Sequence, residues 1–164
     1  GNAGMEHRTH LRRLDRLWVD RPVYFITVCT AKRRALLASA DAAAVLFHEW
    51  QSARERHGWL VGRYVIMPDH VHFFCAETAA GAQRPLARFM GKWNEWTAKG
   101  ICQALGLSAP FWQEQFFDHV LRSDESYAEK WAYVRDNPVR AGLTATWEKW
   151  SWQGWVDFDY PKSM

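Results

Sequence analysis

The middle of the chain contains the pattern that most restricts its fold, a predicted β-hairpin. Two runs rich in β-branched and aromatic residues, Leu60–Ile66 and His70–Ala76, are separated only by residues 67–69 (Met-Pro-Asp). Runs of this composition favour strands, and a short connection with proline and aspartate favours a turn. Strands joined so tightly must pair antiparallel, so we expect an antiparallel sheet built around this hairpin.

The segments on both sides of the hairpin alternate between strand and helix patterns. They predict a strand over 22–30, a helix from 39 or 41 to about 56, a helix over 83–105, a strand over 116–122 and a helix from 123 onwards. The expected apolar stripes are Leu46, Trp50 and Ala53 in the first helix, and Leu86, Phe89, Met90, Trp93, Thr97 and Ala104 in the second. The last helix must end before Pro138, because proline disfavours helical geometry at the residue that precedes it.

The resulting order, β-α-β-β-α-β-α, is typical of an α+β fold. It predicts a ferredoxin-like sandwich, a mainly antiparallel sheet with helices packed on it. We expect one domain over residues 1–164, because the sequence contains no internal repeat and no low-complexity linker. Residues 1–4 resemble an expression scar, residues 5–21 form a basic arm, and residues 144–164 form a tail rich in tryptophan.

Composition and cysteine usage predict a cytoplasmic protein without a membrane partner. Hydrophobic residues make up 48% of the chain and charged residues 24%, an ordinary globular balance. The three cysteines form no CxxC pair, no apolar run reaches the ~18 residues of a membrane span, and no signal peptide is visible. The net charge of +3 and the pI near 8.9 permit a nucleic-acid partner without requiring one.

Two histidines interrupt the second strand of the hairpin. Side chains alternate across a strand, so His70 and His72 project from the same face. Two imidazoles at this spacing can hold one divalent ion and leave coordination positions open, as a catalytic metal site requires. The alternative is a pair of hydrogen-bonded histidines at a strand edge.

Helical geometry separates the two tyrosines of the last predicted helix. Tyr127 falls at i, i+4, i+7 with Trp131 and Val134, so this stripe is predicted to be buried. Tyr133 lies about 120° away from it, by the 3.6-residue period, in polar company. We therefore expect Tyr127 in the core and Tyr133 available for chemistry.

Taken together, these segments resemble the HUH single-tyrosine transposases, specifically the REP-associated tyrosine transposases of bacteria. The resemblance covers most of the chain and rests on YFITVCT, MPDHVHFF, FWQEQFFDHVLRSDES and YVRDNPVRAGL. One departure is Asp69, where many relatives have asparagine; it lies in the turn and leaves the histidine pair intact.

The resemblance implies a metal-dependent endonuclease and strand transferase that cuts single-stranded DNA at a hairpin, or palindromic repeat. The family's nucleophile lies four residues before the asparagine of its Asn-Pro pair, which makes Tyr133 the expected catalytic residue. It forms a 5′-phosphotyrosine intermediate and frees a 3′-hydroxyl. The expected cofactor is Mg²⁺ or Mn²⁺, although histidine ligation by itself equally admits zinc.

The metal ligands are expected to be His70, His72 and Asn137. Asn137 lies four residues after Tyr133, so the two are neighbours if the helix continues between them. If that helix packs over the histidine strand, the phenol and the amide reach the metal together. In the alternative interpretation, Asn137 only caps the end of the helix.

Basic residues in two segments are candidate DNA contacts: Arg8, Arg12, Arg13 and Arg16 in the arm, and Arg84, Arg88 and Lys92 in the second helix. A flexible basic arm can reach bases that a rigid sheet cannot, and the resemblance implies that this region helps to read a sequence beside the hairpin. The helical row has a plainer alternative as a solvated face. The tail tryptophans are expected in the core, with stacking on bases or covering of the active site as the alternatives.

The expected partner is single-stranded DNA with a hairpin structure, met in the bacterial cytoplasm at the nucleoid. The oligomeric state stays open between a monomer and a homodimer, and so does action of Tyr133 in cis or in trans. Two competing functions are a non-catalytic module that binds DNA hairpins, and a metal-dependent hydrolase of small phosphoesters in which Tyr133 is incidental.

Overall fold

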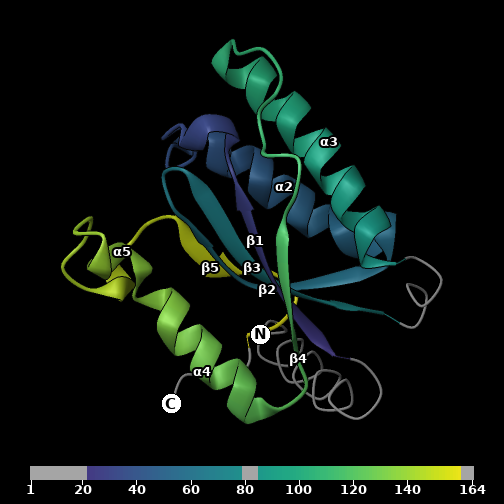
Figure 1. Ribbon diagram of the computed structural model, residues 1–164, viewed down its shortest axis with the longest axis vertical. Helices are drawn as coiled ribbons and strands as arrows, with labels where there is room; N and C mark the ends of the chain where they lie inside the picture. Colours follow the sequence, from purple (N-terminus) through teal and green to yellow (C-terminus); the bar gives the residue numbers. More distant parts are fainter. Residues whose placement is uncertain (1–21, 79–84, 160–164) are drawn as a thin grey trace, which may run out of the picture.

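The computed structural model describes residues 22–78 and 85–159, and its elements are shown in Figure 1. In chain order they are β1 (Val23–Cys29), η1 (Ala31–Arg33), α2 (Ala40–His57), β2 (Trp59–Ile66), β3 (His70–Glu77), α3 (Leu86–Leu105), β4 (Phe117–Leu121), α4 (Asp124–Arg135), α5 (Asn137–Arg140), η3 (Trp147–Lys149) and β5 (Gln153–Trp155). None of the described helices combines the length and the hydropathy needed to cross a bilayer.

The strands form one sheet in the order β4-β1-β3-β2-β5, and every neighbouring pair is antiparallel. The predicted hairpin, β2 and β3, lies inside the sheet, and β1 pairs with β3 from Tyr24↔Cys75 to Cys29↔His70. Helix α2 connects β1 to β2 with β3 between them, and α3 connects β3 to β4 with β1 between them. This arrangement confirms the predicted ferredoxin-like α+β fold.

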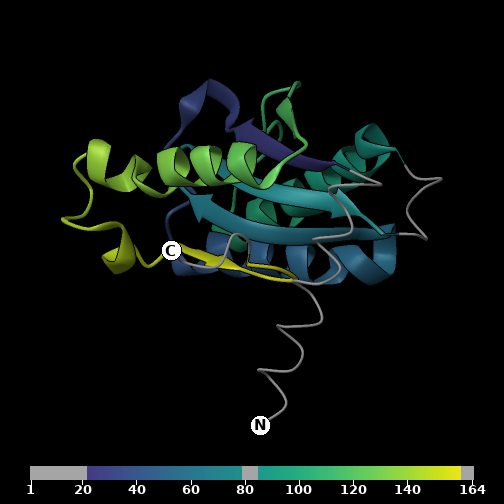
Figure 2. The ribbon, with the colours of Figure 1, turned by 90° about the horizontal axis from the view of Figure 1, so that it is seen from below.

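The helices lie on the two faces of the sheet, with α2 and α3 on one face and α4 on the other (Figure 2). The alternation along β3 assigns its side chains to these faces: Val71 and Phe73 belong to the core under α2 and α3, and Phe74 belongs to the core under α4. His70 and His72 therefore lie on the α4 face of the sheet.

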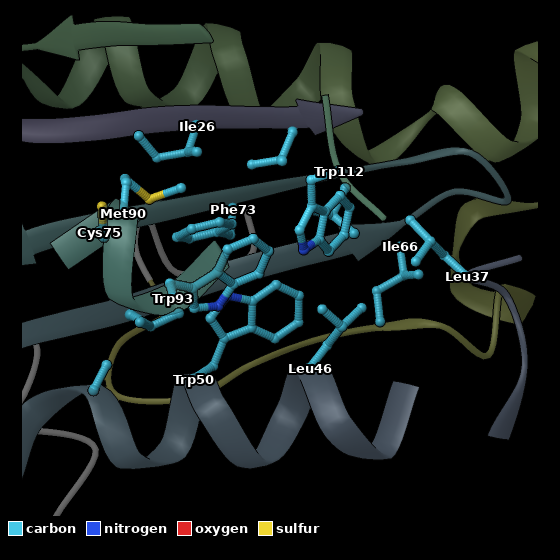
Figure 3. Close-up of a cluster of buried hydrophobic side chains, with 14 of the residues drawn as sticks. Ile26, Leu37, Leu46, Trp50, Ile66, Phe73, Cys75, Met90, Trp93 and Trp112 are labelled. Carbon is cyan, nitrogen blue, oxygen red and sulfur yellow. The ribbon is translucent and has the colours of Figure 1, made fainter. Parts of the chain in front are cut away.

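The core under α2 and α3 accounts for several of the tryptophans. Trp50 of α2 and Trp93 of α3 are stacked with ring centres 6.0 Å apart, and Trp50 lies 5.3 Å from Phe73 of β3 (Figure 3). All three side chains are fully buried. Large aromatic rings thus fill the space between this helical layer and the sheet.

The ends of α2 follow the sequence signals. The Ser39 hydroxyl accepts a hydrogen bond from the Ala42 N–H at 3.3 Å, which caps the helix N-terminus. Gly58 ends the helix with φ 71°, a left-handed conformation that glycine adopts without strain. The stripe predicted for this helix is confirmed, since Leu46, Trp50 and Ala53 are all buried.

The stripe predicted for α3 was wrong at one position. Phe89, Met90, Trp93 and Thr97 are buried as expected, but Ala104 is exposed. Ile101 is buried as well, four residues after Thr97 and therefore on the same side of the helix.

The chain after α4 contains more regular structure than the sequence predicted. Helix α4 ends at Arg135, before Pro138 as expected, but Pro138 then lies in the first turn of the short helix α5. Proline is tolerated there because its missing N–H has no helical partner to lose. Strand β5 was not predicted.

Three tryptophans of this tail pack against the core, which was the default expectation. Trp147 and Trp150 pack against the α4 core, and Trp152 packs against the α2 and α3 core. Trp150 also donates a hydrogen bond from Nε1 to the Ile66 carbonyl at 3.0 Å. The tail is thereby fastened to the end of β2.

Candidate active site

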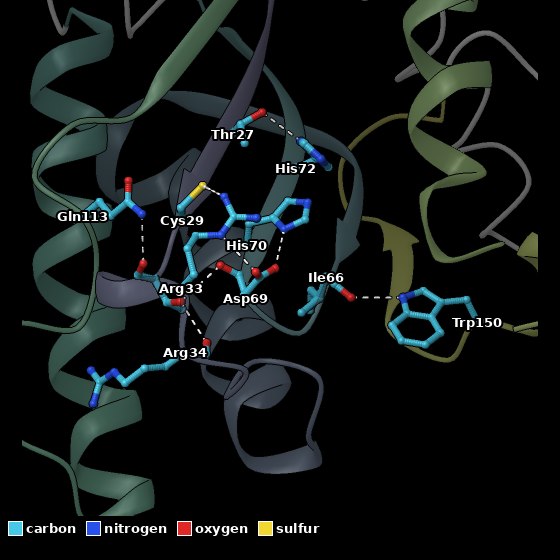
Figure 4. Close-up of polar contacts among 11 residues, drawn as sticks. Thr27, Cys29, Arg33, Arg34, Ile66, Asp69, His70, His72, Gln113 and Trp150 are labelled. Atoms are coloured by element: carbon cyan, nitrogen blue, oxygen red, sulfur yellow. Dashed lines mark hydrogen bonds and ion pairs between the residues drawn. The ribbon is translucent and has the colours of Figure 1, made fainter. Parts of the chain in front are cut away.

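The two histidines lie side by side on β3, on the face that α4 covers. Their ring centres are 4.8 Å apart and the rings meet nearly edge to face. Figure 4 shows both imidazoles at the end of the hairpin, close to the turn that carries Asp69. His70 is part-buried, with 16% of its side chain exposed, so the pair remains open on one side.

One nitrogen of each imidazole is held by a neighbouring side chain. His70 Nδ1 donates to Asp69 Oδ1 at 2.8 Å, and His72 Nδ1 shares a hydrogen bond of 2.8 Å with Thr27 Oγ1 (Figure 4). Within the described residues, Nε2 of neither ring has a hydrogen-bond partner. Fixing Nδ1 in this way orients the ring and leaves Nε2 available to a ligand, which is the usual arrangement where histidine binds a metal.

Asp69 is itself held in the ionised state. Burial alone raises the pKa of a carboxyl, but the hydrogen bonds from His70 and Arg33 outweigh it and lower the pKa of Asp69. Arg33 Nε donates to Asp69 Oδ2 at 2.9 Å, and the Arg33 backbone takes φ 53°, which a non-glycine residue rarely adopts. The loop after β1 therefore supplies a cation that fixes the orienting carboxylate.

His72 is neutral at physiological pH. Burial, the largest cause, and the neighbouring basic groups His70, Lys130, Arg140 and Arg33 together lower its pKa to about 3. A metal ligand must be a neutral imidazole, so this environment keeps His72 in the form that binds a cation.

The donor set fits a divalent ion held by two nitrogens with other positions open. Among residues 22–78 and 85–159, no group of three His, Cys, Asp or Glu side chains is placed to hold a metal. A further donor must then come from an amide, a solvent molecule or a phosphate oxygen. Oxygen donors of this kind suit Mg²⁺ and Mn²⁺ better than they suit a closed structural zinc site.

The tyrosines differ sharply in their environments. Tyr127 is fully buried, and burial raises its pKa well above the usual value. Burial also raises the pKa of Tyr24 and of Tyr64. Tyr133, by contrast, is 62% exposed on α4, so it is the described tyrosine that a substrate can reach. The predicted division between Tyr127 and Tyr133 is confirmed.

Asn137 is the first residue of α5 rather than the last turn of α4. The helix breaks at Asp136, which has φ −89° and ψ 0°, so the expected continuous i, i+4 pair with Tyr133 is wrong. The two residues are linked instead by Arg140, which donates to the Tyr133 carbonyl at 2.6 Å and to Asn137 Oδ1. The alternative in which Asn137 caps α4 is also wrong, because Asp136 occupies that position.

Arg140 also lies against the Tyr133 ring, with its guanidinium 4.0 Å from the ring centre. Such contacts attract a cation to the face of an aromatic ring. Asn137 Oδ1 accepts a hydrogen bond from Arg140, which leaves one of its two lone pairs for a metal. The role of Asn137 as a ligand stays a prediction.

Helix α4 faces the histidines. Tyr127, Trp131 and Val134 pack on the sheet, and Lys130 extends to Phe25 of β1, 5.1 Å from the ring centre. Phe25 in turn stacks on His72 at 5.2 Å. The convergence of the Tyr133 hydroxyl with the two imidazoles stays a prediction.

Two of the expected DNA contacts lie in the described residues, and both are separated from the histidine pair. Arg88 and Lys92 lie on α3, on the opposite face of the sheet, where they line a hollow of about 300 Å³ together with Arg56 and Trp96. Their role in DNA binding stays a prediction. The remaining candidates lie outside the described residues: Arg8, Arg12, Arg13, Arg16 and Arg84.

Sequence reasoning missed the residues that support the site. Asp69 was noted only as a departure from the family, whereas it binds His70 and Arg33. Thr27 lies directly opposite His72 in the β1–β3 register, which a sequence does not reveal before the strands are paired. Arg140 lies seven residues after Tyr133 along the helix pattern, a spacing that could have marked it as a neighbour.

Comparisons with known proteins agree on the fold. No protein-family model matches the sequence. A Haemophilus influenzae protein described as uncharacterized is 21% identical over 173 residues, which cover 84% of this chain and 92% of the relative. A solved REP-associated tyrosine transposase, bound to a REP hairpin, aligns with a TM-score of 0.63 and 22% identity over 80% of this chain and 75% of that chain.

A second solved structure, a candidate transposase from Deinococcus radiodurans R1, aligns with a TM-score of 0.50 and 16% identity over 70% of this chain and 90% of that chain. This chain shares the fold of both. At such identities the likeness establishes the α+β architecture, and the chemistry has to be argued from the residues of the site.

Proposed function

We propose that this protein is a metal-dependent single-stranded DNA endonuclease and strand transferase of the HUH single-tyrosine type. Its proposed substrate is DNA that carries a hairpin, as in palindromic repeats. The observation that carries the proposal is the exposed Tyr133 on a helix that covers the same sheet face as an oriented histidine pair. The fold likeness to a REP-associated tyrosine transposase bound to a REP hairpin supports the choice of substrate.

In the proposed reaction, the Tyr133 phenol oxygen attacks the phosphorus of a phosphodiester in the single strand. The phenol gives up its proton as it attacks, the bond from phosphorus to the 3′ oxygen breaks, the 3′ oxygen takes up a proton, and the 5′ phosphate remains on the tyrosine. One phosphodiester is exchanged for another, so no external energy source is needed. Reversal with a different 3′-hydroxyl joins strands.

The surrounding residues have separate roles in this proposal. His70 and His72 would hold the divalent ion through Nε2, while Asp69 and Thr27 orient the two rings. When bound, the ion stabilises the negative charge that develops on the phosphate. Arg140 keeps positive charge beside the Tyr133 ring.

The test is formation of a covalent adduct between the protein and a single-stranded hairpin oligonucleotide in the presence of Mg²⁺. The oligonucleotides are palindromes that flank the gene, and the adduct is detected by a shift in denaturing electrophoresis. We expect an adduct with the natural protein and none with Tyr133→Phe, because the phenylalanine has no attacking oxygen. Tyr127→Phe is the matched control and keeps the adduct, since that hydroxyl is buried.

The same experiment separates the competing functions. Hairpin binding without any adduct contradicts the proposal and supports a non-catalytic binding module. Metal-dependent phosphoester hydrolysis that survives Tyr133→Phe supports a hydrolase in which the tyrosine is incidental.

A further inference from the structure

Strand β4 leaves a strip of the sheet uncovered beside the histidine pair. It is an edge strand, and the residues from Phe117 to Val120 are exposed. Phe117 is 65% exposed, the largest exposed fraction among the large hydrophobic side chains of the described residues. An exposed aromatic side chain on an edge strand invites aggregation, so its presence calls for a reason other than packing.

The strand register places Phe117 in one row with the candidate metal site. Phe117 lies opposite Thr27, and Thr27 lies opposite His72. Residues directly opposite each other in antiparallel strands share a face, so all three side chains project from the α4 face of the sheet. Two strand spacings put the Phe117 and His72 backbones about 10 Å apart.

This row ends in a positively charged surface. Lys130 of α4, Arg140 of α5 and Arg33 of η1 all lie close enough to His72 to act on it electrostatically. Asp69, the acid next to His70, is bound by His70 and Arg33. Asp118, the neighbour of Phe117, projects to the opposite face because side chains alternate along β4. The charge around the row thus complements a phosphate backbone.

The ring of Phe117 is free to receive a partner. Within the described residues it stacks on no other aromatic side chain, in contrast to the rings of Phe25 and Phe74 in the covered part of the same face. Every nucleobase has a π face that stacks on an aromatic side chain, but in a duplex both faces are already covered by neighbouring bases. An exposed ring beside this positively charged surface therefore suits a single strand, whose bases have free faces.

We propose that Phe117 is a stacking platform for a nucleobase of single-stranded DNA whose phosphate lies at His70 and His72. The inference rests on the proposed function for the identity of the strand. It adds the place where a base next to the scissile phosphate is held, and it makes Phe117 a binding and positioning residue. Because stacking tolerates every base, Phe117 contributes affinity and register rather than sequence preference.

The test measures binding of a fluorescein-labelled oligothymidine of about 20 nucleotides, longer than common single-strand site sizes. Binding is followed by fluorescence anisotropy with Mg²⁺ in the Tyr133→Phe background, which excludes strand cutting. We expect Phe117→Ala to weaken binding about 5- to 100-fold, the range found when an aromatic stacking partner is removed. Phe117→Trp retains a stacking ring and should bind within about twofold of the parent.

Val120→Ala is the matched control. Val120 is an exposed apolar residue of the same strand, but it projects from the other face. We expect its binding to stay unchanged. Circular dichroism on all variants checks that the fold is kept. A second readout needs no substitution at Phe117: 2-aminopurine in the oligonucleotide should be quenched on binding to the parent protein.

Unchanged binding by Phe117→Ala, or an equal loss with Val120→Ala, would overturn the stacking platform. The failure of the proposed function gives a different pattern. If Phe117→Ala weakens binding but the natural protein forms no adduct at Tyr133, the platform stands and the strand transferase does not. If the adduct forms while Phe117→Ala binds like the parent, the reverse holds.

Discussion

Asp69 and Thr27 make a prediction about metal affinity that is independent of DNA. Each holds Nδ1 of one histidine at 2.8 Å, so removal of either partner frees a ring to rotate. We expect Asp69→Ala and Thr27→Val each to weaken Mn²⁺ binding about 10- to 100-fold, the usual cost of losing such an outer partner. Isothermal titration of the protein with Mn²⁺ measures the change.

Asp69→Asn is the control for this experiment. The amide oxygen still accepts the hydrogen bond from His70, so most of the affinity should remain, in keeping with the asparagine found in many proteins of the family that the sequence resembles. Equal affinities for the parent, Asp69→Ala and Thr27→Val would show that these contacts do not support a metal site.

The key side chains of the site were more predictable from sequence than their supports. His70 and His72 follow from the two-residue period of a strand, and Tyr133 follows from its angle to a buried helical stripe. Thr27 could not be predicted, because its contact depends on how β1 registers with β3. The contacts of Arg140 depend on the break between α4 and α5. The sequence predicted that the helix ends before Pro138, but it did not predict that a second helix starts at Asn137.

The docking of the tail on β2 makes a prediction about stability. A Cβ atom on Gly62 would lie 2.2 Å from Phe158 Cε2, and Phe158 is buried in the α4 core. Gly62→Ala therefore forces the ring out of place, and we expect it to lower the free energy of unfolding by about 1–3 kcal/mol, as overpacking does. Urea denaturation followed by circular dichroism measures this change.

Gly91→Ala is the matched control. Gly91 lies in the interior of α3, and an added Cβ would meet nothing within 4 Å. Alanine also restricts the unfolded chain and favours a helix, so this variant should gain about 0.5–1 kcal/mol. Equal effects of the two substitutions would mean that Phe158 does not seat against Gly62.

The elements with strong local signals were predictable, and those that depend on tertiary contacts were not. Helix α2 has a serine cap, a buried stripe and a terminal glycine, and each signal agrees with the others. Strand β5 has only three residues, all half-buried, and exists because Arg63, Tyr64 and Val65 of β2 offer it an edge. A segment so short carries no periodicity of its own to detect.

Within residues 22–78 and 85–159, charged side chains gather on both faces of the sheet. The histidine pair lies on the α4 face, while Arg88 and Lys92 line the hollow on the α2 and α3 face. If this second surface contacts DNA, the double variant Arg88→Gln, Lys92→Gln should reduce the slope of log affinity against log salt for a long single strand by about 1.4. Titrations at several NaCl concentrations give this slope.

Arg54→Gln serves as the control for this charge removal, because Arg54 belongs to α2 but does not line the hollow. A slope that is the same for the double variant and the parent would assign Arg88 and Lys92 to a solvated face. Neither outcome alters the chemistry proposed for Tyr133, which belongs to the other face of the sheet.

The central claim is that the phenol of Tyr133 and the imidazoles of His70 and His72 gather around one ion, and fluorine NMR tests it directly. Incorporation of 3-fluorotyrosine labels the five tyrosines, and Tyr133→Phe identifies the resonance of interest. Paramagnetic Mn²⁺ broadens nearby nuclei. We predict that Mn²⁺ broadens the Tyr133 resonance more than that of the buried Tyr127, and that His72→Ala abolishes the effect. A Tyr133 resonance that stays sharp when Mn²⁺ is bound would contradict the account.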